Sequence, residues 1–209
     1  EPYPEAAMKK IVSLLRQYDC EKHVYFMLET DVQIQQFKLY APDIPVCVGH
    51  LKARPWEIVD RAIALHCEKV QLFKPYYNQE MIDKAHEQGL KVVMDMIFNH
   101  CGSSHWWMED LPTGDWLNFD NTFVPTSHQK WTQVDPHAAP SEKKLFTDGW
   151  FNRGMPDLNQ RNPLVSDYLI QTSTWWIEYA RIDGIRQDTH PYMDAEFASK
   201  WCKATMEEY

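Results

Sequence analysis

Two spacings of apolar residues alternate along this chain. In residues 5–18 the apolar positions Met8, Ile11, Val12 and Leu15 recur three and four residues apart, which predicts a helix with one buried face. Short apolar runs of strand length follow such helical stretches. The predicted helices span 5–18, 31–40, 55–65, 78–89, 163–180 and 194–206, and the predicted strands span 23–28, 46–49, 70–73, 91–98 and 182–187. This alternation predicts a parallel sheet with crossover helices.

Polar residues, proline and glycine mark the expected helix ends. Asp31, Asn78 and Asp194 stand where a side chain could cap the first turn of a helix. Pro42 and Gly89 stand where a helix has to stop, because proline cannot continue it and glycine accepts the left-handed conformation that ends it.

The apolar pattern breaks down once, between residues 101 and 162. This stretch is rich in Trp, Pro, Asp, Asn and His and follows neither spacing. Because structureless loops of such length are uncommon in compact domains unless they are functional, we expect an irregular lobe inserted after the fourth strand. A closed barrel of this kind needs about eight strands, and about five are predicted. The sequence therefore predicts an α/β fold with parallel strands and one inserted lobe, which in a barrel-type fold would be a partial (β/α) TIM-type barrel.

Composition narrows the classes of function. The net charge is −9, so the chain lacks the basic surface of a nucleic-acid-binding protein. No apolar run reaches the roughly 18 residues of a membrane-spanning helix. The five cysteines form no C-x-x-C pair, which argues against a zinc knuckle. The chain opens with Glu1-Pro2-Tyr3-Pro4, which reads like the start of a mature protein. The sequence leaves the cellular compartment undecided, and a periplasmic or extracellular location would require a removed leader.

The candidate chemistry begins at the end of the fifth predicted strand. Arg186 and Asp188 lie two residues apart in the run G-I-R-Q-D, so both side chains point to the same side of the chain. In a parallel barrel this strand end belongs to the catalytic face. A guanidinium beside a carboxylate keeps it ionised, which a carboxylate nucleophile requires. The same pair could also be an ordinary surface ion pair.

Two earlier segments complete a known pattern. Residues 91–100 read K-V-V-M-D-M-I-F-N-H, and residues 155–159 read M-P-D-L-N. With the strand that carries Arg186 and Asp188, these segments, in this order, resemble the α-amylase superfamily of retaining glycoside hydrolases over residues 92–209. The M-P-D-L-N form and the D-T-x-P-Y-x-D tail are most similar to the neopullulanase and cyclomaltodextrinase branch, whose substrates are α-linked glucose oligosaccharides.

The resemblance implies a role for each matched residue. Asp188 would be the nucleophile, and Arg186 would hold it ionised. His100 would donate a hydrogen bond to the sugar at the cleavage point, with Asp95 beneath it as a buried acceptor. Asn99 would shape the loop and is a candidate calcium ligand, although no cofactor is required.

Several aromatic and polar residues have roles that the resemblance leaves open. Many family members carry Lys-His where this chain has Pro191 and Tyr192, so His190 could replace that contact with the next sugar and Tyr192 could stack on a sugar ring. Asp157 is expected to fix its loop. His105, Trp106 and Trp107 could equally line a glucan cleft or pack the lobe.

The resemblance also implies parts that the printed chain lacks. The general acid/base Glu of the family lies on the next strand, whereas Glu196, Glu207 and Glu208 follow a helical pattern. Retaining hydrolysis needs a second carboxyl group roughly 5–5.5 Å from the nucleophile. We therefore expect a catalytically incomplete piece of an α-glucan hydrolase with negligible turnover. The open sheet edge after the Asp188 strand could support a homo-oligomer.

Residues 1–91 resemble a different barrel. The passages P-D-I-P-V at 42–46 and I-D-x-A-H-x-x-G-L-x-V at 82–92 are similar to the later part of a glycerophosphodiester phosphodiesterase. This resemblance implies a chimeric or fused chain with domains 1–91 and 92–209. The alternative functions are a phosphodiester hydrolase that uses the predicted strand ends Glu29, His50 and Lys74, and an inactive chimeric barrel.

Overall fold

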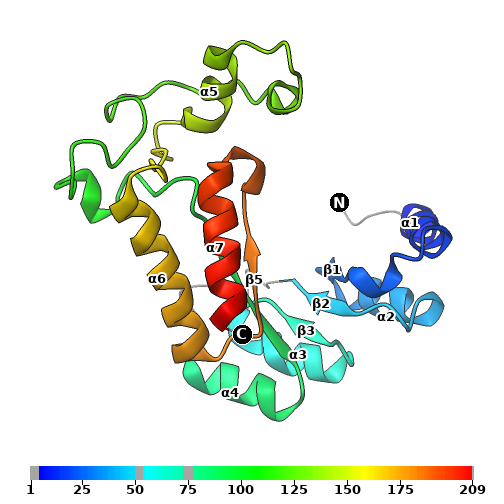
Figure 1. The fold of residues 1–209 in the computed structure, drawn as a ribbon. Coiled ribbons are helices and arrows are strands. Elements are labelled where there is room, and N and C mark those ends of the chain that lie inside the picture. The colour runs from blue at the N-terminus through cyan, green and yellow to red at the C-terminus, as the bar shows by residue number, and fades with distance from the viewer. Residues whose placement is uncertain (1–4, 50–53, 73–77, 209) are drawn as a thin grey trace. The chain divides into compact units, whose positions relative to one another are not determined.

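The structure is a computed structural model that describes residues 5–49, 54–72 and 78–208 (Figure 1). Its helices are α1 (Glu5–Gln17), α2 (Asp31–Tyr40), α3 (Ile58–Ala64), α4 (Gln79–Glu87), α5 (Pro140–Asp148), α6 (Pro163–Ala180) and α7 (Ala195–Glu208). Short 3-10 turns are η1 (Glu21–His23), η2 (Pro55–Glu57), η3 (Trp106–Met108), η4 (Lys130–Gln133) and η5 (His190–Tyr192). The strands are β1 (Phe26–Leu28), β2 (Val46–Val48), β3 (Lys69–Val70), β4 (Lys91–Met96) and β5 (Gly184–Gln187).

The strands form one five-stranded sheet in the order β1-β2-β3-β4-β5. Parallel pairing joins Met27 to Cys47, Val48 to Val70, and Val70 to Val92. Next to β4, the amide of Asp183 donates to Val92 O at 2.8 Å and the amide of Asp188 donates to Met96 O at 2.9 Å, so β5 runs in the same direction. The chain is therefore a partial (β/α) barrel of parallel strands, as the apolar pattern predicts.

Two compact units divide the chain: Glu1–Met94 with Ile182–Ile185, and Asp95–Arg181 with Arg186–Tyr209. In the first unit, β-branched and aromatic side chains from the strands and from α2, α3 and α4 form the core. Its fully buried members are Ile34, Phe37, Ile44, Val46, Val48, Ile58, Val59, Val70 and Ile82. The near-continuous apolar strands suit a parallel sheet that helices cover.

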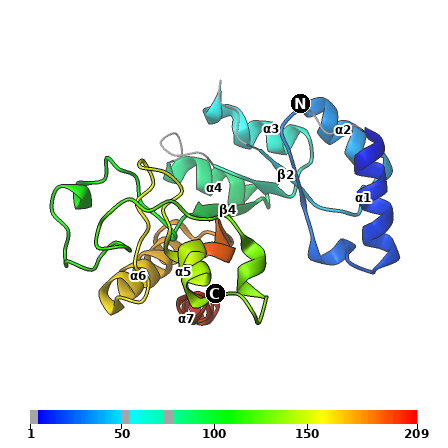
Figure 2. The same ribbon diagram turned by 90° about the horizontal axis from the view of Figure 1, so that it is seen from above.

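The second unit is built around the helix pair α6 and α7, which lie side by side in Figures 1 and 2. Trp201 of α7 packs edge-on against Phe98, with ring centroids 5.4 Å apart. Its indole N–H donates to the buried Ser173 hydroxyl of α6 at 2.8 Å. Because a buried indole N–H needs an acceptor, this hydrogen bond fixes the two helices against each other.

Most of the predicted helix ends are confirmed. The Asn78 side chain accepts from the Met81 amide at 2.9 Å, Gly89 adopts φ +71°, and Asp194 accepts from the Phe197 amide at 2.9 Å. The prediction for Asp31 is wrong, because Thr30 caps α2 by accepting from the Gln33 amide. Asp31 instead forms an ion pair with Arg61.

The inserted lobe is more regular than its sequence suggests. It contains α5, a nine-residue helix that the apolar pattern misses. The signal was local: Pro140 occupies the first turn, and the Glu142 carboxylate accepts from the Ala139 amide at 3.1 Å. Proline at the first helical position followed by a glutamate that reaches back to the cap residue is a typical helix start.

Asp183 holds the start of β5 against β4 within the first unit. Its carboxylate accepts from the Val92 amide at 2.8 Å, from Lys91 at 2.7 Å and from His86 at 3.0 Å. Burial opposes ionisation of Asp183, but these donors outweigh it and lower its pKa below the usual value. A carboxyl group with a lowered folded-state pKa stabilises the fold above its unfolded pKa of about 3.9, and this stabilisation is lost as the pH falls through the folded pKa.

We expect Asp183→Asn to destabilise the chain at pH 7 by about 1–3 kcal/mol, because the Lys91 ammonium, the His86 ring and the Val92 amide lose their anionic partner. The difference from the unsubstituted chain should shrink as the pH falls below about 4. Denaturant unfolding followed by circular dichroism at pH 7 and at pH 3.5 measures both effects. The matched control is Asp60→Asn, which removes an exposed ion pair with Lys84 in the same unit and should change stability by less than about 0.5 kcal/mol. Equal losses for the two variants would contradict the prediction.

Candidate active site at the ends of β4 and β5

One guanidinium joins the two strand ends. Arg186, on β5, donates from Nη1 to Asp95 Oδ2 at 2.7 Å, and its Nη2 lies 2.9 Å from Asp188 Oδ1. Asp95 belongs to β4, and Asp188 follows the last residue of β5. The side chains that the sequence singled out on two different strands therefore meet on a single arginine.

A sharp turn immediately after β5 sets the position of Asp188. The Asp188 amide is held by Met96 O at 2.9 Å. The next residue, Thr189, has φ +52°, a left-handed conformation that is rare for a β-branched side chain and costs on the order of 1–2 kcal/mol. The Tyr192 amide then donates to Thr189 O at 2.9 Å and starts η5. Strain of this kind persists where the surrounding structure holds it, and it is common at functional sites.

Arg186 and its two carboxylate partners, Asp95 and Asp188, influence one another's protonation through their charges. Burial raises the pKa of Asp95, while the hydrogen bond and charge of Arg186 lower it and the negative charge of Asp188 adds to the rise. Burial alone would lower the pKa of Arg186, but the two carboxylates outweigh this effect and raise it. Arg186 therefore stays charged between two carboxyl groups. Asp95 is not buried as expected, since 29% of its side chain is exposed.

His100 follows β4 and lies close enough to Asp188 to sense its charge. Burial lowers the pKa of His100, and the negative charge of Asp188 partly offsets this effect. The imidazole is therefore predominantly neutral at pH 7. Its Nδ1 is buried without a hydrogen-bond partner, and its ring packs edge-on against Phe151 with centroids 5.2 Å apart. A neutral imidazole has one donor and one acceptor nitrogen.

A buried aspartate anchors the lobe beside His100. Both oxygens of Asp157 accept amide N–H groups at 2.7 Å, one from Asn99 and one from Asn118. Backbone bridges run from Asp157 to His100 and from Leu158 to Leu117. Burial holds the pKa of Asp157 well above its usual value, and the two amide donors offset part of this rise. As expected, Asp157 fixes its loop.

The Asn99 side chain was the candidate calcium ligand. Its Oδ1 is buried without a hydrogen-bond partner, which suits a cation. Ca²⁺ takes about six to eight oxygen ligands, however, and both oxygens of the neighbouring Asp157 are already occupied by amide donors. Within the described ranges, no group of three or more His, Cys, Asp and Glu side chains could hold a metal. A calcium role for Asn99 therefore stays a prediction.

Comparison with known proteins decides the family. Residues 77–207 match the catalytic domain of α-amylase. The chain belongs to the α-amylase family. A cyclomaltodextrinase of Thermoanaerobacter pseudethanolicus is 30% identical over 130 residues, which cover 59% of this chain and 20% of that protein. A trehalose synthase/amylase of Mycolicibacterium smegmatis is 28% identical over 129 residues, which cover 54% of this chain and 21% of that protein.

The fold of this α-amylase family member matches solved structures over more of its length. An α-amylase from Geobacillus thermoleovorans, complexed with acarbose, aligns with a TM-score of 0.59 and 22% identity, covering 89% of this chain and 43% of that one. The chain matches only about a fifth of the length of its curated relatives. The family match begins at residue 77, within the segment whose sequence resembles a phosphodiesterase, and the matches above do not reproduce that second resemblance.

In this α-amylase family chain, Tyr192 contacts the lobe. Its hydroxyl lies 3.1 Å from His128 Nδ1, and its ring stacks on Phe146 at 4.3 Å and meets Phe151 edge-on at 4.7 Å. His190, at the start of η5, is exposed. The turn after Asp188 is thus packed on the lobe, a contact between distant segments that sequence reasoning missed.

The two candidate tryptophans of the lobe differ in how far their side chains are exposed. Trp107 is 4% exposed and packs against Trp116, whereas Trp106 is 62% exposed. Trp107 is therefore a packing residue, and Trp106 has a surface free for other contacts. Glu29 is exposed after β1, and the proposed phosphodiesterase residues His50 and Lys74 lie outside the described residues. No helix in the described part of the chain is long and apolar enough to cross a bilayer.

We expect Asp188→Asn to lower the pKa of His100 further, because the variant removes the negative charge that favours the imidazolium. An NMR titration of the His100 ring, assigned through a His100→Gln spectrum, measures this shift. Asp167→Asn, which removes an exposed ion pair with Lys200, serves as the control and should leave the titration unchanged. An unchanged or raised pKa in Asp188→Asn would show that Asp188 and His100 do not interact as described.

Proposed function

We propose that Asp188 is the nucleophile of a retaining glycoside hydrolase that acts on α-linked glucose oligosaccharides. The observation that carries this proposal is the arrangement around Arg186, which holds Asp188 at the end of β5 while His100 lies close by in its neutral form. Membership of the α-amylase family supports the reaction class. The cyclomaltodextrinase relative and the M-P-D-L-N segment support oligosaccharides of the neopullulanase and cyclomaltodextrinase type.

In the proposed reaction, an Asp188 carboxylate oxygen attacks the anomeric carbon of the sugar. The bond from this carbon to the glycosidic oxygen breaks as the new ester bond to Asp188 forms, and the leaving oxygen takes a proton from a general acid. Water later hydrolyses the ester and regenerates the carboxylate. Arg186 fixes the orientation of Asp188 through its Nη2, and Asp95 holds the Nη1 of the same guanidinium.

The neutral His100 ring would position the substrate. Its donor N–H can reach a sugar hydroxyl without carrying a positive charge that would compete with the charge on the reacting carbon. His190 and Tyr192 follow the nucleophile on η5, and we propose that His190, which is exposed, contacts the sugar on the leaving-group side. The Tyr192 ring, packed on the lobe, would form the wall beside it.

The proton donor limits this chain. Among the described residues, the carboxyl groups seen to pair with Arg186 are Asp95 and Asp188, and the glutamates Glu196, Glu207 and Glu208 belong to α7 and are exposed. Proton transfer to the leaving group contributes about 10²–10⁴-fold to such reactions. We therefore propose that the 209-residue chain hydrolyses ordinary glucans negligibly, although its nucleophile is in place.

A glycosyl fluoride tests the nucleophile separately from the acid. Fluoride departs with little help from a proton, and a second fluorine at C5 of the ring slows hydrolysis of the covalent intermediate. We expect 5-fluoro-α-maltosyl fluoride to label the peptide that contains Asp188, as shown by mass spectrometry. Asp188→Asn should give no label, and Arg186→Gln should label at least about tenfold more slowly.

Asp167→Asn is the matched control, since Asp167 lies in an exposed ion pair of the same unit and its loss should leave labelling intact. A label on Asp95 or another carboxylate would assign the nucleophile elsewhere. Absence of label on the folded chain would refute the proposed reaction.

We further propose that residues 1–91 have a separate origin from residues 92–209, as their phosphodiesterase resemblance implies. The boundary of the two compact units at Met94 and Asp95 falls next to the expected join at 90–93, whereas the first unit also includes residues 182–185 and the α-amylase match begins before the join, at residue 77. Sequencing a transcript across the codons for Leu90 to Val93 tests whether one message carries both parts.

We also propose that the sheet edge allows self-association. β1 and β5 are the terminal strands of the five-stranded order, and an edge strand offers unpaired backbone groups to a second copy. Sedimentation velocity across a range of protein concentrations should show a dimer that increases with concentration. A constant monomer mass would contradict this expectation.

A further inference from the structure

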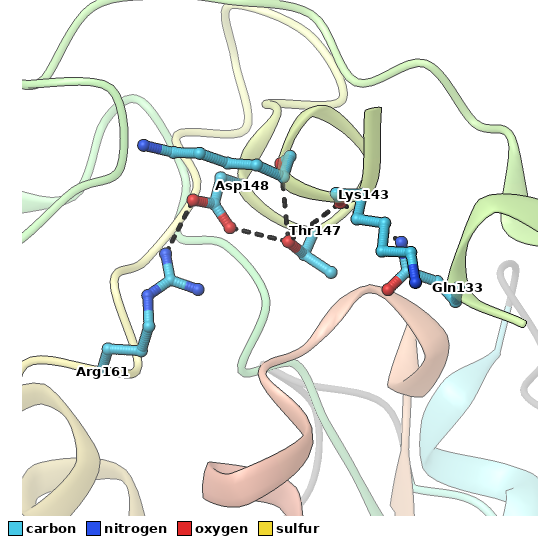
Figure 3. Close-up of a pocket in the computed structure, with 6 residues that line it drawn as sticks. Gln133, Lys143, Thr147, Asp148 and Arg161 are labelled. Carbon is cyan, nitrogen blue, oxygen red and sulfur yellow. Dashed lines mark hydrogen bonds and ion pairs between the residues drawn. The ribbon is translucent and has the colours of Figure 1, made fainter. Parts of the chain in front are cut away.

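A small cavity lies in the second unit, and none of its lining residues takes part in the proposed reaction. Its volume is about 290 Å³, near the lower end of the range for small-molecule pockets. It lies beside α5, and its lining is polar and charged (Figure 3). The lining residues are Gln133, Lys143, Lys144, Thr147, Asp148 and Arg161.

The ion pair of Asp148 and Arg161 gives the cavity a fixed part. Asp148 has 2% of its side chain exposed, and its Oδ2 accepts from Arg161 Nη2 at 2.7 Å. Its other oxygen accepts from the Thr147 hydroxyl at 2.7 Å. The same Arg161 nitrogen donates to Asn118 Oδ1 at 2.9 Å. Figure 3 shows the Arg161 guanidinium directed toward the Asp148 carboxylate. The guanidinium is therefore held in place before any ligand arrives.

Two lysines contribute charge that the protein does not neutralise locally. Within the described part of the chain, no carboxylate lies within 4.0 Å of the ammonium of Lys143 or Lys144. The Lys144 ammonium lies over the Phe119 ring, 5.4 Å from its centroid. Phe119 itself has a left-handed backbone conformation, with φ +55°. The cavity lining thus carries three cations and one carboxylate in a chain of net charge −9, and a second carboxylate, Asp194, lies 3.7 Å from Arg161 Nη1. A local excess of positive charge in an acidic protein favours an anionic ligand.

The donors around the cavity suit one class of anion. Lysine and arginine N–H groups form charge-assisted hydrogen bonds with phosphate oxygens. Gln133 donates its side-chain N–H groups to Thr132 Oγ1 and to Lys143 O, which leaves its amide oxygen able to accept from a hydroxyl. The Thr147 oxygen can accept as well, because its proton is given to Asp148.

We infer that this cavity binds a phosphate group, either as free phosphate or on a small sugar phosphate. Lys143 and Lys144 supply the charge, the oriented Arg161 supplies further N–H donors, and Gln133 and Thr147 accept from hydroxyl groups of the ligand. The site is independent of the proposed hydrolytic reaction, since none of its lining residues belongs to the cluster around Arg186.

Isothermal titration calorimetry at low ionic strength tests the inference with glucose 1-phosphate, inorganic phosphate and glucose as probes. We expect both phosphates to bind, glucose not to bind, and added salt to weaken the interaction. Tighter binding of glucose 1-phosphate than of inorganic phosphate would identify a sugar phosphate as the ligand, and equal binding would identify free phosphate.

Lys143→Gln/Lys144→Gln should lose at least about tenfold in affinity for phosphate. The matched control, Lys22→Gln/Lys203→Gln, removes the same total charge from exposed positions outside the cavity and should keep the affinity. Asp188→Asn should also bind phosphate normally, so failure of the hydrolase proposal would not be mistaken for failure of this one. Lys144→Gln alone, with its fold checked by circular dichroism, replaces the double variant if that variant does not fold.

Three results would overturn the inference. These are no binding of either phosphate to the intact chain, equal affinity for glucose and glucose 1-phosphate, and equal losses in the cavity variant and its control. The last result would assign the binding to overall charge instead of to the cavity.

Discussion

The double ion pair of Arg186 is the interaction on which the candidate site depends. Parallel strands bring their carboxyl ends to one edge of a sheet, so side chains there converge without any further design. Two carboxyl groups placed together would repel each other, and one of them would tend to hold a proton. Arg186 between Asp95 and Asp188 removes this conflict, because one charge serves both partners. The half-exposed position keeps the desolvation cost low.

The lobe depends on a different device. Asp157 is fully buried, and a buried carboxyl group is costly unless its oxygens are hydrogen-bonded. Asn99 and Asn118 supply these bonds from the end of β4 and from the lobe itself. The network therefore connects the irregular lobe to the strand that carries Asp95. Because the donors are neutral amides, they leave the pKa of Asp157 raised, and the anchor relies on geometry more than on charge.

Sequence reasoning succeeded where one local rule decides the outcome. Asn78, Gly89 and Asp194 act at helix ends as their side chains or backbone freedom dictate, and the strand order follows from the βα alternation. It failed where several segments compete. Thr30 and Asp31 are both good cap residues, and Asp31 is taken by Arg61, which lies thirty residues away in the sequence.

The same limit applied to the site. The motif brought Asp95, His100, Arg186 and Asp188 together, since strand ends must meet. It could not show that Asp95 is partly exposed or that Tyr192 packs on Phe146 and His128, because such contacts depend on the path of a lobe without periodicity. The apolar pattern did not predict α5, and for this reason it also gave no sign of the cation-lined cavity beside that helix.

Buried polar atoms without partners gather beside the candidate nucleophile. Asn99 Oδ1 and His100 Nδ1 follow β4, and Thr189 Oγ1 follows Asp188 in a strained backbone. Each such atom costs about 1–3 kcal/mol in a folded protein. By contrast, the buried polar side chains of Ser173 and Asp157 are hydrogen-bonded. All three atoms therefore lie at residues that closely follow β4 or β5, close to the ion pairs of Arg186.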